Sequence, residues 1–283
     1  MATMTIDGHV HLWNAEHTPQ PWMTEEHAPI ARPFGPDDIV PLLTANGIDR
    51  VILVQGAALD SDTDYLFEEA ARSEWIGAVT AWCCLDDPAR AESRLEELAA
   101  RPKFRGVRHL SHGEPEHWLV RPQVLECVAM LEQRDLILEI PVVWPHHFDD
   151  VLSLVERFPR LRIVIDHLGK PPIGTPEMAG WASALRATAD CPNVFAKVSG
   201  LNTALGKADW TIDDLRPAID TAVECFGPAR LMCGSDWPYS LMNGEFNRVW
   251  GLTSRALRDA APDDSEKLLG GNARELYGVA APV

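Results

Sequence analysis

The sequence predicts a single-domain (β/α)8 barrel, the TIM-barrel fold, over residues 1–283. Eight short apolar segments with the composition of strands alternate with amphipathic helical segments, at about 30 residues per unit. Such alternation predicts a parallel sheet, and eight units predict that the sheet closes into a barrel. An open doubly wound sheet is the alternative. It would normally carry a glycine-rich phosphate turn after the first strand, where Gly8 is the only glycine.

The predicted strands are short runs of apolar residues. Val51-Ile52-Leu53-Val54, for example, is continuously apolar, which is typical of a strand covered on both faces. We expect the eight strands at 5–13, 51–55, 76–82, 104–109, 136–140, 162–166, 194–198 and 231–234.

The predicted helices carry start and stop signals. Pro88 stands in the first turn of one helix, where proline is tolerated, and Gly47 follows the end of another. A proline-rich loop over 14–36 is long enough for a function to be expected of it. We expect helices at 37–46, 62–73, 87–99, 123–134, 149–157, 176–189, 213–226 and 245–260, and a C-terminal helical cap from about 262 with its helix over 264–277.

Composition limits the partners of the chain. The formal net charge of −17 argues against nucleic acid and anionic lipid as partners, and no stretch of about 18 apolar residues could cross a membrane. The N-terminal residues have neither the basic region nor the apolar core of a signal peptide. The six cysteines show no Cys-x-x-Cys spacing, so we expect free thiols in a reducing, cytoplasmic compartment. The oligomeric state stays open.

Four reactive side chains fall at predicted strand ends. His9 and His11 share one face of the first strand, about 7 Å apart, and two such imidazoles can hold one divalent cation. Taken alone, the pair also fits one structural and one rim histidine. In a barrel, however, all C-terminal strand ends meet at one mouth, where His167 and Asp236 would join them. The joint placement predicts a metal or hydrolytic site.

Asp236 precedes a sharp turn. Pro238 disfavours a helical conformation at Trp237, so the chain must leave the strand abruptly and present the carboxylate at the mouth. The carboxylate could be a metal ligand, a general base, or both.

Other strand-end residues are candidates for substrate contacts. Arg108 offers forked donors to carbonyl or carboxylate oxygens. Lys197 could have either of two roles. It could form a buried ion pair with Asp166 or Glu139, or it could be a cation that polarises a carbonyl. Flat indole rings after strands suit a sugar or aromatic ring. The predicted substrate-binding residues are Gln55, Arg108, Trp144, Lys197 and Trp237.

Five motifs in this order resemble the amidohydrolase superfamily, and more narrowly its lactonase branch, which includes sugar lactonases and pyrone dicarboxylate lactonases. The resemblance covers nearly the whole chain and implies a (β/α)8 barrel that opens a lactone ring. It implies that Asp236 is the general base and that His9, His11 and His167 are site histidines. The motifs are Asp7-Gly8-His9-Val10-His11-Leu12-Trp13, Phe104-Arg105-Gly106-Val107-Arg108, Asp166-His167-Leu168-Gly169-Lys170-Pro171, Lys197-Val198-Ser199-Gly200-Leu201 and Gly234-Ser235-Asp236-Trp237-Pro238.

The sequence departs from the wider superfamily in its metal ligands. The fourth strand has no lysine that could be carboxylated as a bridging ligand. The fifth strand has no histidine, although His146 and His147 follow it. We therefore expect no binuclear centre. One Zn²⁺ could sit on His9, His11 and Asp236, while the lactonase branch also includes members that work without metal.

The expected reaction is attack of water on a lactone carbonyl of a small-molecule substrate, a sugar lactone or a carboxylated lactone. Asp236 would remove the proton from the water, and His167 is the second predicted catalytic residue. The developing oxyanion would be stabilised by a metal or, without one, by His11, His167, Arg108 or Lys197. Two alternatives stay open: a metal-dependent decarboxylase on the same scaffold, and a Schiff-base lyase that uses Lys197.

Overall fold

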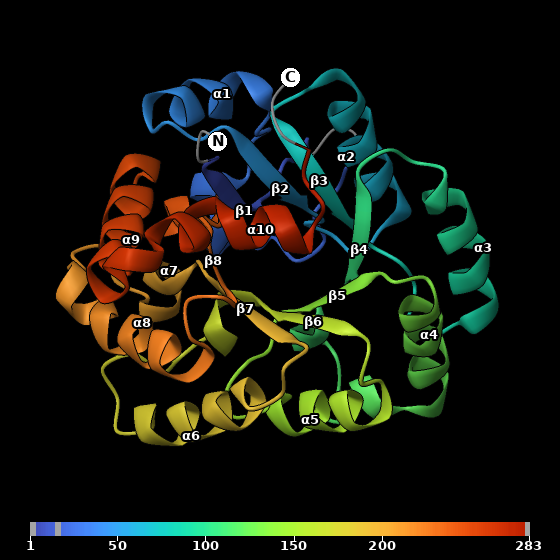
Figure 1. Cartoon of the computed structure of the whole chain (residues 1–283). Helices are drawn as coiled ribbons and strands as arrows, with labels where there is room; N and C mark the ends of the chain where they lie inside the picture. The colour runs from blue at the N-terminus through green and yellow to red at the C-terminus, as the bar shows by residue number, and fades with distance from the viewer. Residues whose placement is uncertain (1–3, 15–17, 281–283) are drawn as a thin grey trace.

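The structure, a computed structural model, describes residues 4–14 and 18–280. Its eight strands are parallel and pair in chain order, so that each strand lies beside the next one in the sequence (Figure 1). The strands are β1 (Ile6–Val10), β2 (Arg50–Val54), β3 (Ile76–Ala81), β4 (Phe104–Arg108), β5 (Ile137–Ile140), β6 (Arg162–Ile165), β7 (Val194–Val198) and β8 (Leu231–Cys233).

Backbone contacts between the first and last strands close the sheet. The Asp236 amide donates to the His9 carbonyl at 2.9 Å, and the His11 amide donates to the Trp237 carbonyl at 2.7 Å. Val10 and Trp237 form a parallel bridge. The predicted (β/α)8 barrel is confirmed, and the alternative of an open sheet is wrong.

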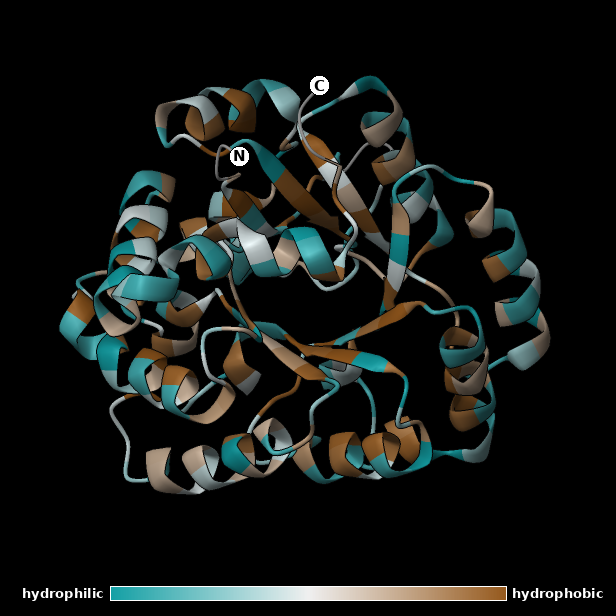
Figure 2. Cartoon of the chain, in the orientation of Figure 1, coloured by the Kyte–Doolittle hydropathy of each residue, from teal (hydrophilic) through white to brown (hydrophobic). Residues whose placement is uncertain are grey.

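Amphipathic helices surround the barrel. In α5 the buried residues Phe148, Val151 and Leu154 recur every third position and face the strands. Figure 2 shows apolar strands inside a ring of helices that are partly hydrophilic. The helices begin and end within about two residues of the predicted ranges: α1 (Pro36–Ala45), α2 (Asp60–Arg72), α3 (Pro88–Ala99), α4 (Pro122–Gln133), α5 (Phe148–Arg157), α6 (Met178–Ala189), α8 (Ile212–Phe226) and α9 (Phe246–Ala260).

Several short helical turns in the loops were not predicted. The loop expected over 14–36, of which 15–17 lie outside the described residues, contains a 3-10 helix, η1. These turns are too short to leave a periodic apolar pattern. They are η1 (Glu25–Ile30), η2 (Ser111–Gly113), η3 (Trp118–Val120), η4 (Asp166–Gly169), α7 (Leu201–Leu205) and η5 (Tyr239–Met242).

The C-terminal cap differs from the single helix expected over 264–277. It consists of η6 (Pro262–Asp264), a π-helical turn η7 (Lys267–Gly271) and α10 (Asn272–Leu276). Gly270 explains the break, because a Cβ there would lie 1.9 Å from the Met4 carbonyl oxygen. The chain can approach the start of β1 this closely only with glycine.

The cap seals the N-terminal end of the barrel. Figure 1 shows α10 (red) lying across the barrel. Ala273, Leu276 and Tyr277 pack on residues near the strand starts such as Ile6 and Ile137. The opposite, C-terminal mouth is therefore the end available for a site. In the described part of the chain, no helix has the length and apolar character needed to cross a bilayer.

Candidate active site

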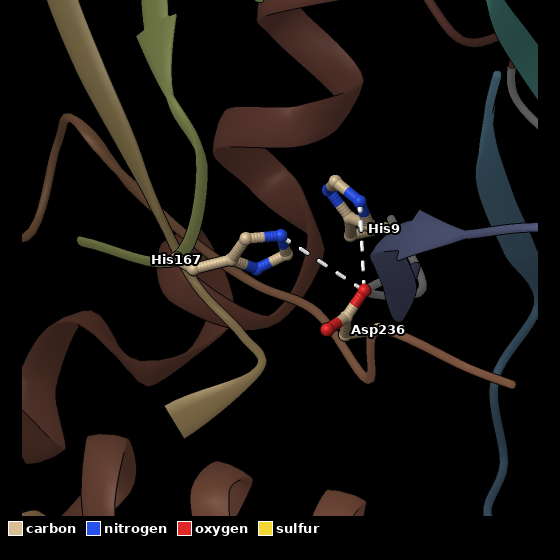
Figure 3. Close-up of side chains that lie close together, drawn as sticks. All are labelled: His9, His167 and Asp236. Carbon is tan, nitrogen blue, oxygen red and sulfur yellow. Dashed lines mark ion pairs between the residues drawn. The ribbon is translucent and has the colours of Figure 1, made fainter. Parts of the chain in front are cut away.

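Four predicted side chains meet at the C-terminal mouth: His9 from β1, His11 just after β1, His167 from η4 and Asp236 after β8. The Nε2 atoms of His9 and His11 are 3.1 Å apart. Asp236 Oδ1 lies 3.8 Å from His9 Nε2, 3.5 Å from His11 Nε2 and 3.9 Å from His167 Nε2. Figure 3 shows His9 and His167 pointing toward the Asp236 carboxylate. Three imidazoles thus surround one carboxylate oxygen.

Burial sets the charges in this cluster. It lowers the pKa of His9 well below its ordinary value, and it also lowers the pKa of His167. Burial would raise the pKa of Asp236, but its contacts with His167, His11 and His9 outweigh this effect and hold that pKa well below its usual range. At neutral pH the arrangement is an ionised carboxylate beside the His9 and His167 imidazoles, which favour the neutral form, and it can accept a proton or hold a cation.

The backbone fixes Asp236 in place. Its φ of +59° is a left-handed conformation, sparsely populated for non-glycine residues, and the chain turns there as the sequence predicts. Asp7 ties the two strands together below the turn, because its Oδ1 accepts from the amides of His9 at 3.1 Å and Ser235 at 2.8 Å. Burial raises the pKa of Asp7 to about 7.

Gly200 leaves room beside the reactive groups. It has a φ of +61°, and a Cβ there would lie 2.6 Å from Asp236 Oδ2 and 2.8 Å from His167 Nδ1. The same His167 nitrogen lies 2.9 Å from Ser199 Oγ. A side chain at position 200 would displace both reactive groups, so this position requires glycine.

A network of ion pairs supports the cluster inside the barrel. Lys197 is fully buried, with Nζ 2.6 Å from Glu139 Oε2, 3.3 Å from His9 Nδ1 and 3.7 Å from Asp166 Oδ1. Arg108 Nε lies 2.7 Å from Asp166 Oδ2. Burial opposes ionisation of Asp166, but His9, Arg108 and Lys197 hold its pKa well below the usual range. Of the two roles expected for Lys197, the structure shows the buried ion pair.

Two groups of side chains could hold a metal ion. The ligand atoms of His9, His167 and Asp236 all lie within 4.8 Å of one another, and so do those of His9, Glu139 and Asp166. The second group surrounds the Lys197 ammonium, which already supplies a positive charge there.

A cavity of about 480 Å³ opens above the cluster. Its size suits a small molecule, and its wall combines aromatic rings with a few polar groups, as ligand sites usually do. The lining residues are His11, Trp13, Trp22, His27, Gly56, Arg108, Leu110, His112, Gly113, Pro141, His167, Lys170, Gly200, Thr203, Ala204, Asp236 and Tyr239.

Four residues predicted to bind substrate do not line this cavity. Gln55 and Lys197 are fully buried beneath it, and Gln55 donates to the Arg108 carbonyl at 3.2 Å. Trp144 packs against Phe148, with ring centroids 6.1 Å apart. Trp237 is buried edge-to-face on a phenylalanine. The geometry gives these predicted contacts no support.

Several lining residues were not predicted. Trp22 and His27 come from the loop over 14–36, whose length was the only signal. His112 and Tyr239 come from loops after β4 and β8. Lys170 stands in the Asp166–Pro171 motif, but nothing in its spacing assigned it a role.

A closed (β/α)8 barrel with histidines and an aspartate gathered at its C-terminal mouth has its reactive groups where barrel enzymes carry their active sites. The chain belongs to the amidohydrolase family: the family model described as "Amidohydrolase" matches residues 6–279. It is an amidohydrolase-type hydrolase.

The relatives of the chain extend along its whole length. An L-fucono-1,5-lactonase from Burkholderia ambifaria is 34% identical over 99% of this chain and 97% of its own. Crystal structures of an amidohydrolase from Burkholderia multivorans, with bound HEPES and with bound zinc, are 31% and 30% identical. Both have a TM-score of 0.89 and cover 98% of this chain and 100% of theirs.

Proposed function

We propose that the protein hydrolyses the 1,5-lactone of a sugar acid to the open-chain acid. The observation that carries the proposal is the Asp236 carboxylate, held among three histidines at the floor of a cavity of about 480 Å³. The aromatic rings of Trp13, Trp22 and Tyr239 in the wall suit the apolar face of a sugar ring. The similarity to an L-fucono-1,5-lactonase supports the same reaction.

The residues present fit one divalent metal, with zinc the best match. The Nε2 atoms of His9 and His11 and Oδ1 of Asp236 are separated by 3.1 to 3.8 Å, close to the spacing of ligands around tetrahedral zinc. His11 Nδ1 lies 2.8 Å from the Val54 carbonyl, which can only accept, so His11 Nε2 keeps a free lone pair. A relative whose crystal structure contains bound zinc supports zinc as the metal.

A second metal is not part of the proposal. The other group of ligand atoms encloses the Lys197 ammonium, paired with Glu139 at 2.6 Å. When bound at His9, His11 and Asp236, a divalent metal would polarise the lactone carbonyl and acidify water.

The side chains of the site carry out proton transfer, hydrogen bonding and substrate positioning. Asp236 takes a proton from the attacking water, whose oxygen bonds to the carbonyl carbon. The ring C–O bond breaks, and Asp236 returns the proton to the departing ring oxygen. His167, held by Ser199, donates to or accepts from the reacting oxygens. Arg108 lines the cavity and directs a substrate oxygen through its fixed guanidinium.

A lactone screen tests the proposal. Purified protein, with its metal content measured on the same sample, is assayed with sugar 1,5-lactones, sugar 1,4-lactones and a pyrone dicarboxylate, using acid release as the readout. The proposal predicts saturable hydrolysis of 1,5-lactones above the buffer rate. Absence of lactone hydrolysis in zinc-loaded protein, or release of CO₂ from a carboxylated aromatic acid, would overturn it.

A further inference from the structure

One cation in the cavity wall has no partner. Arg108 and Lys170 are the lysine and arginine residues that line the cavity. Arg108 is engaged, because its Nε lies 2.7 Å from Asp166 and its Nη1 donates to the Gln55 carbonyl at 3.1 Å. Within residues 4–14 and 18–280, the Lys170 ammonium makes neither an ion pair nor a hydrogen bond, although Lys170 is partly buried in the cavity wall.

A partly buried lysine without a partner differs from the usual pattern in a folded protein. Lysine side chains are normally exposed or paired, because removing the charge from water is costly. The same barrel pairs its fully buried lysine, Lys197, with Glu139 at 2.6 Å. Burial lowers the pKa of Lys170, as expected for a group lacking a close counter-charge. A ligand with negative charge would complete its environment.

The backbone turn that brings Lys170 to the cavity wall has a disfavoured conformation. His167, Leu168, Gly169 and Lys170 are four consecutive residues with positive φ, of 53°, 52°, 71° and 50°. Such conformations are disfavoured for residues other than glycine and persist where the surroundings enforce them. In this turn the Trp181 indole donates to the Leu168 carbonyl at 2.7 Å. The turn carries both His167 and Lys170 to the cavity wall.

The location of Lys170 indicates which part of the substrate it meets. The cations Arg108 and Lys170 reach the cavity from the end of β4 and from the segment after β6. The aromatic rings Trp13 and Tyr239 reach it from the segments after β1 and β8, across the barrel. The two sides of the cavity therefore differ, one cationic and one aromatic.

We propose that Lys170 is a substrate-binding and catalytic residue whose ammonium binds the oxygens of the lactone ester group. The proposal rests on the lactonase function proposed for the same cavity. Attack by water places negative charge on the carbonyl oxygen, and ring opening leaves a carboxylate, whereas the substrate is neutral. Lys170 stabilises the negative charge in both states and turns the ester toward β4 and β6, with the sugar ring toward the aromatic side.

Comparing the binding of the charged product with that of an uncharged analogue tests whether Lys170 contacts the carboxylate. Zinc-loaded wild type, Lys170→Met and Lys170→Arg are titrated by calorimetry with L-fuconate and with L-fucitol, which lacks the carboxylate. Lys207→Met is the matched control, since Lys207 pairs with Asp214 on the surface. We expect Lys170→Met to weaken L-fuconate binding at least 10-fold and L-fucitol binding less than 2-fold. Lys170→Arg should retain most of the L-fuconate affinity. In turnover, kcat of Lys170→Met should fall by about 10²-fold, as for loss of an oxyanion donor.

Other outcomes would overturn the assignment. Equal weakening of both ligands would mean general damage to the cavity, and unchanged L-fuconate binding would mean that Lys170 does not meet the carboxylate. Wild-type protein that prefers L-fucitol, or binds both equally, would also contradict it. Because the titration needs no turnover, it decides the role of Lys170 even if the lactone screen fails.

Discussion

Arg108 and Lys197 show how neighbouring residues of one barrel interior can differ in role. Both lie beside Asp166, with nitrogen–oxygen distances of 2.7 and 3.7 Å. Arg108 also reaches the cavity wall, whereas Lys197 is enclosed and paired with Glu139. The first is placed to touch a substrate, and the second is placed to neutralise carboxylates beneath the site.

Arg108→Lys should lower kcat/KM by about 10²-fold, because lysine keeps the charge and loses the fork that fixes substrate geometry. Steady-state kinetics on the best lactone measures it. Arg230→Lys is the control, since Arg230 lies outside the cavity lining and donates to the backbone carbonyls of Cys191 and Ala189. Wild-type kinetics in Arg108→Lys would show that Arg108 is only structural.

Lys197→Met should destabilise the fold by about 3–5 kcal/mol, because the Glu139 and Asp166 charges would be left buried without their cation. Urea unfolding measures the change, and Lys207→Met, at an exposed ion pair, should alter it little. Unchanged stability in Lys197→Met would mean that the network tolerates loss of the ammonium, which would contradict a structural role for Lys197.

The sequence predicted some site residues and missed others for physical reasons. His9 and His11 follow from strand alternation, and Asp236 from the sharp turn enforced by Pro238. Position at a strand end does not specify the direction of a side chain beyond the strand, so Trp144 and Trp237 were expected at the cavity but pack elsewhere.

At the scale of elements, the left-handed turn after β6 is the part that local sequence rules could not foresee. Gly169 alone among its four residues tolerates positive φ easily, and the turn depends on contacts distant in sequence, such as the bond from Trp181 to Leu168. The loop over 14–36 was expected to be functional, and Trp22 and His27 from it line the cavity. By contrast, the strands were predictable from short continuous apolar runs, and the long helices from a periodic apolar pattern.

Gly169→Ala should destabilise the protein by about 1–3 kcal/mol and lower kcat. Its φ is +71°, and the added Cβ would lie 2.5 Å from Phe148 Cζ, so the turn that holds His167 would have to shift. Gly174→Ala is the matched control, since its φ is +78° but its Cβ would meet nothing within 4 Å. Urea unfolding and lactone kinetics compare the two. Equal effects would mean that backbone strain alone, without the clash, accounts for the change.

At the scale of the whole molecule, the barrel separates stability from chemistry. The C-terminal cap closes one end with apolar contacts and with Tyr277, whose hydroxyl donates to Glu139. The four reactive side chains and the cavity occupy the other end. Glu139 links the ends through Lys197. This division is typical of barrel enzymes, in which loops at the C-terminal mouth carry the chemistry.

The central claim is that Asp236 is the base of a lactone hydrolase, and Asp236→Asn tests it most directly. Asparagine keeps the size of the side chain and removes the basic oxygen. The variant and wild type are compared in kcat, KM and bound metal on the same lactone, with the exposed Asp220→Asn as control. We predict that kcat falls by about 10²–10⁴-fold while KM changes far less. If the variant loses its metal and excess Zn²⁺ restores activity, Asp236 acts only as a metal ligand and not as the base. A kcat near that of wild type would contradict the account.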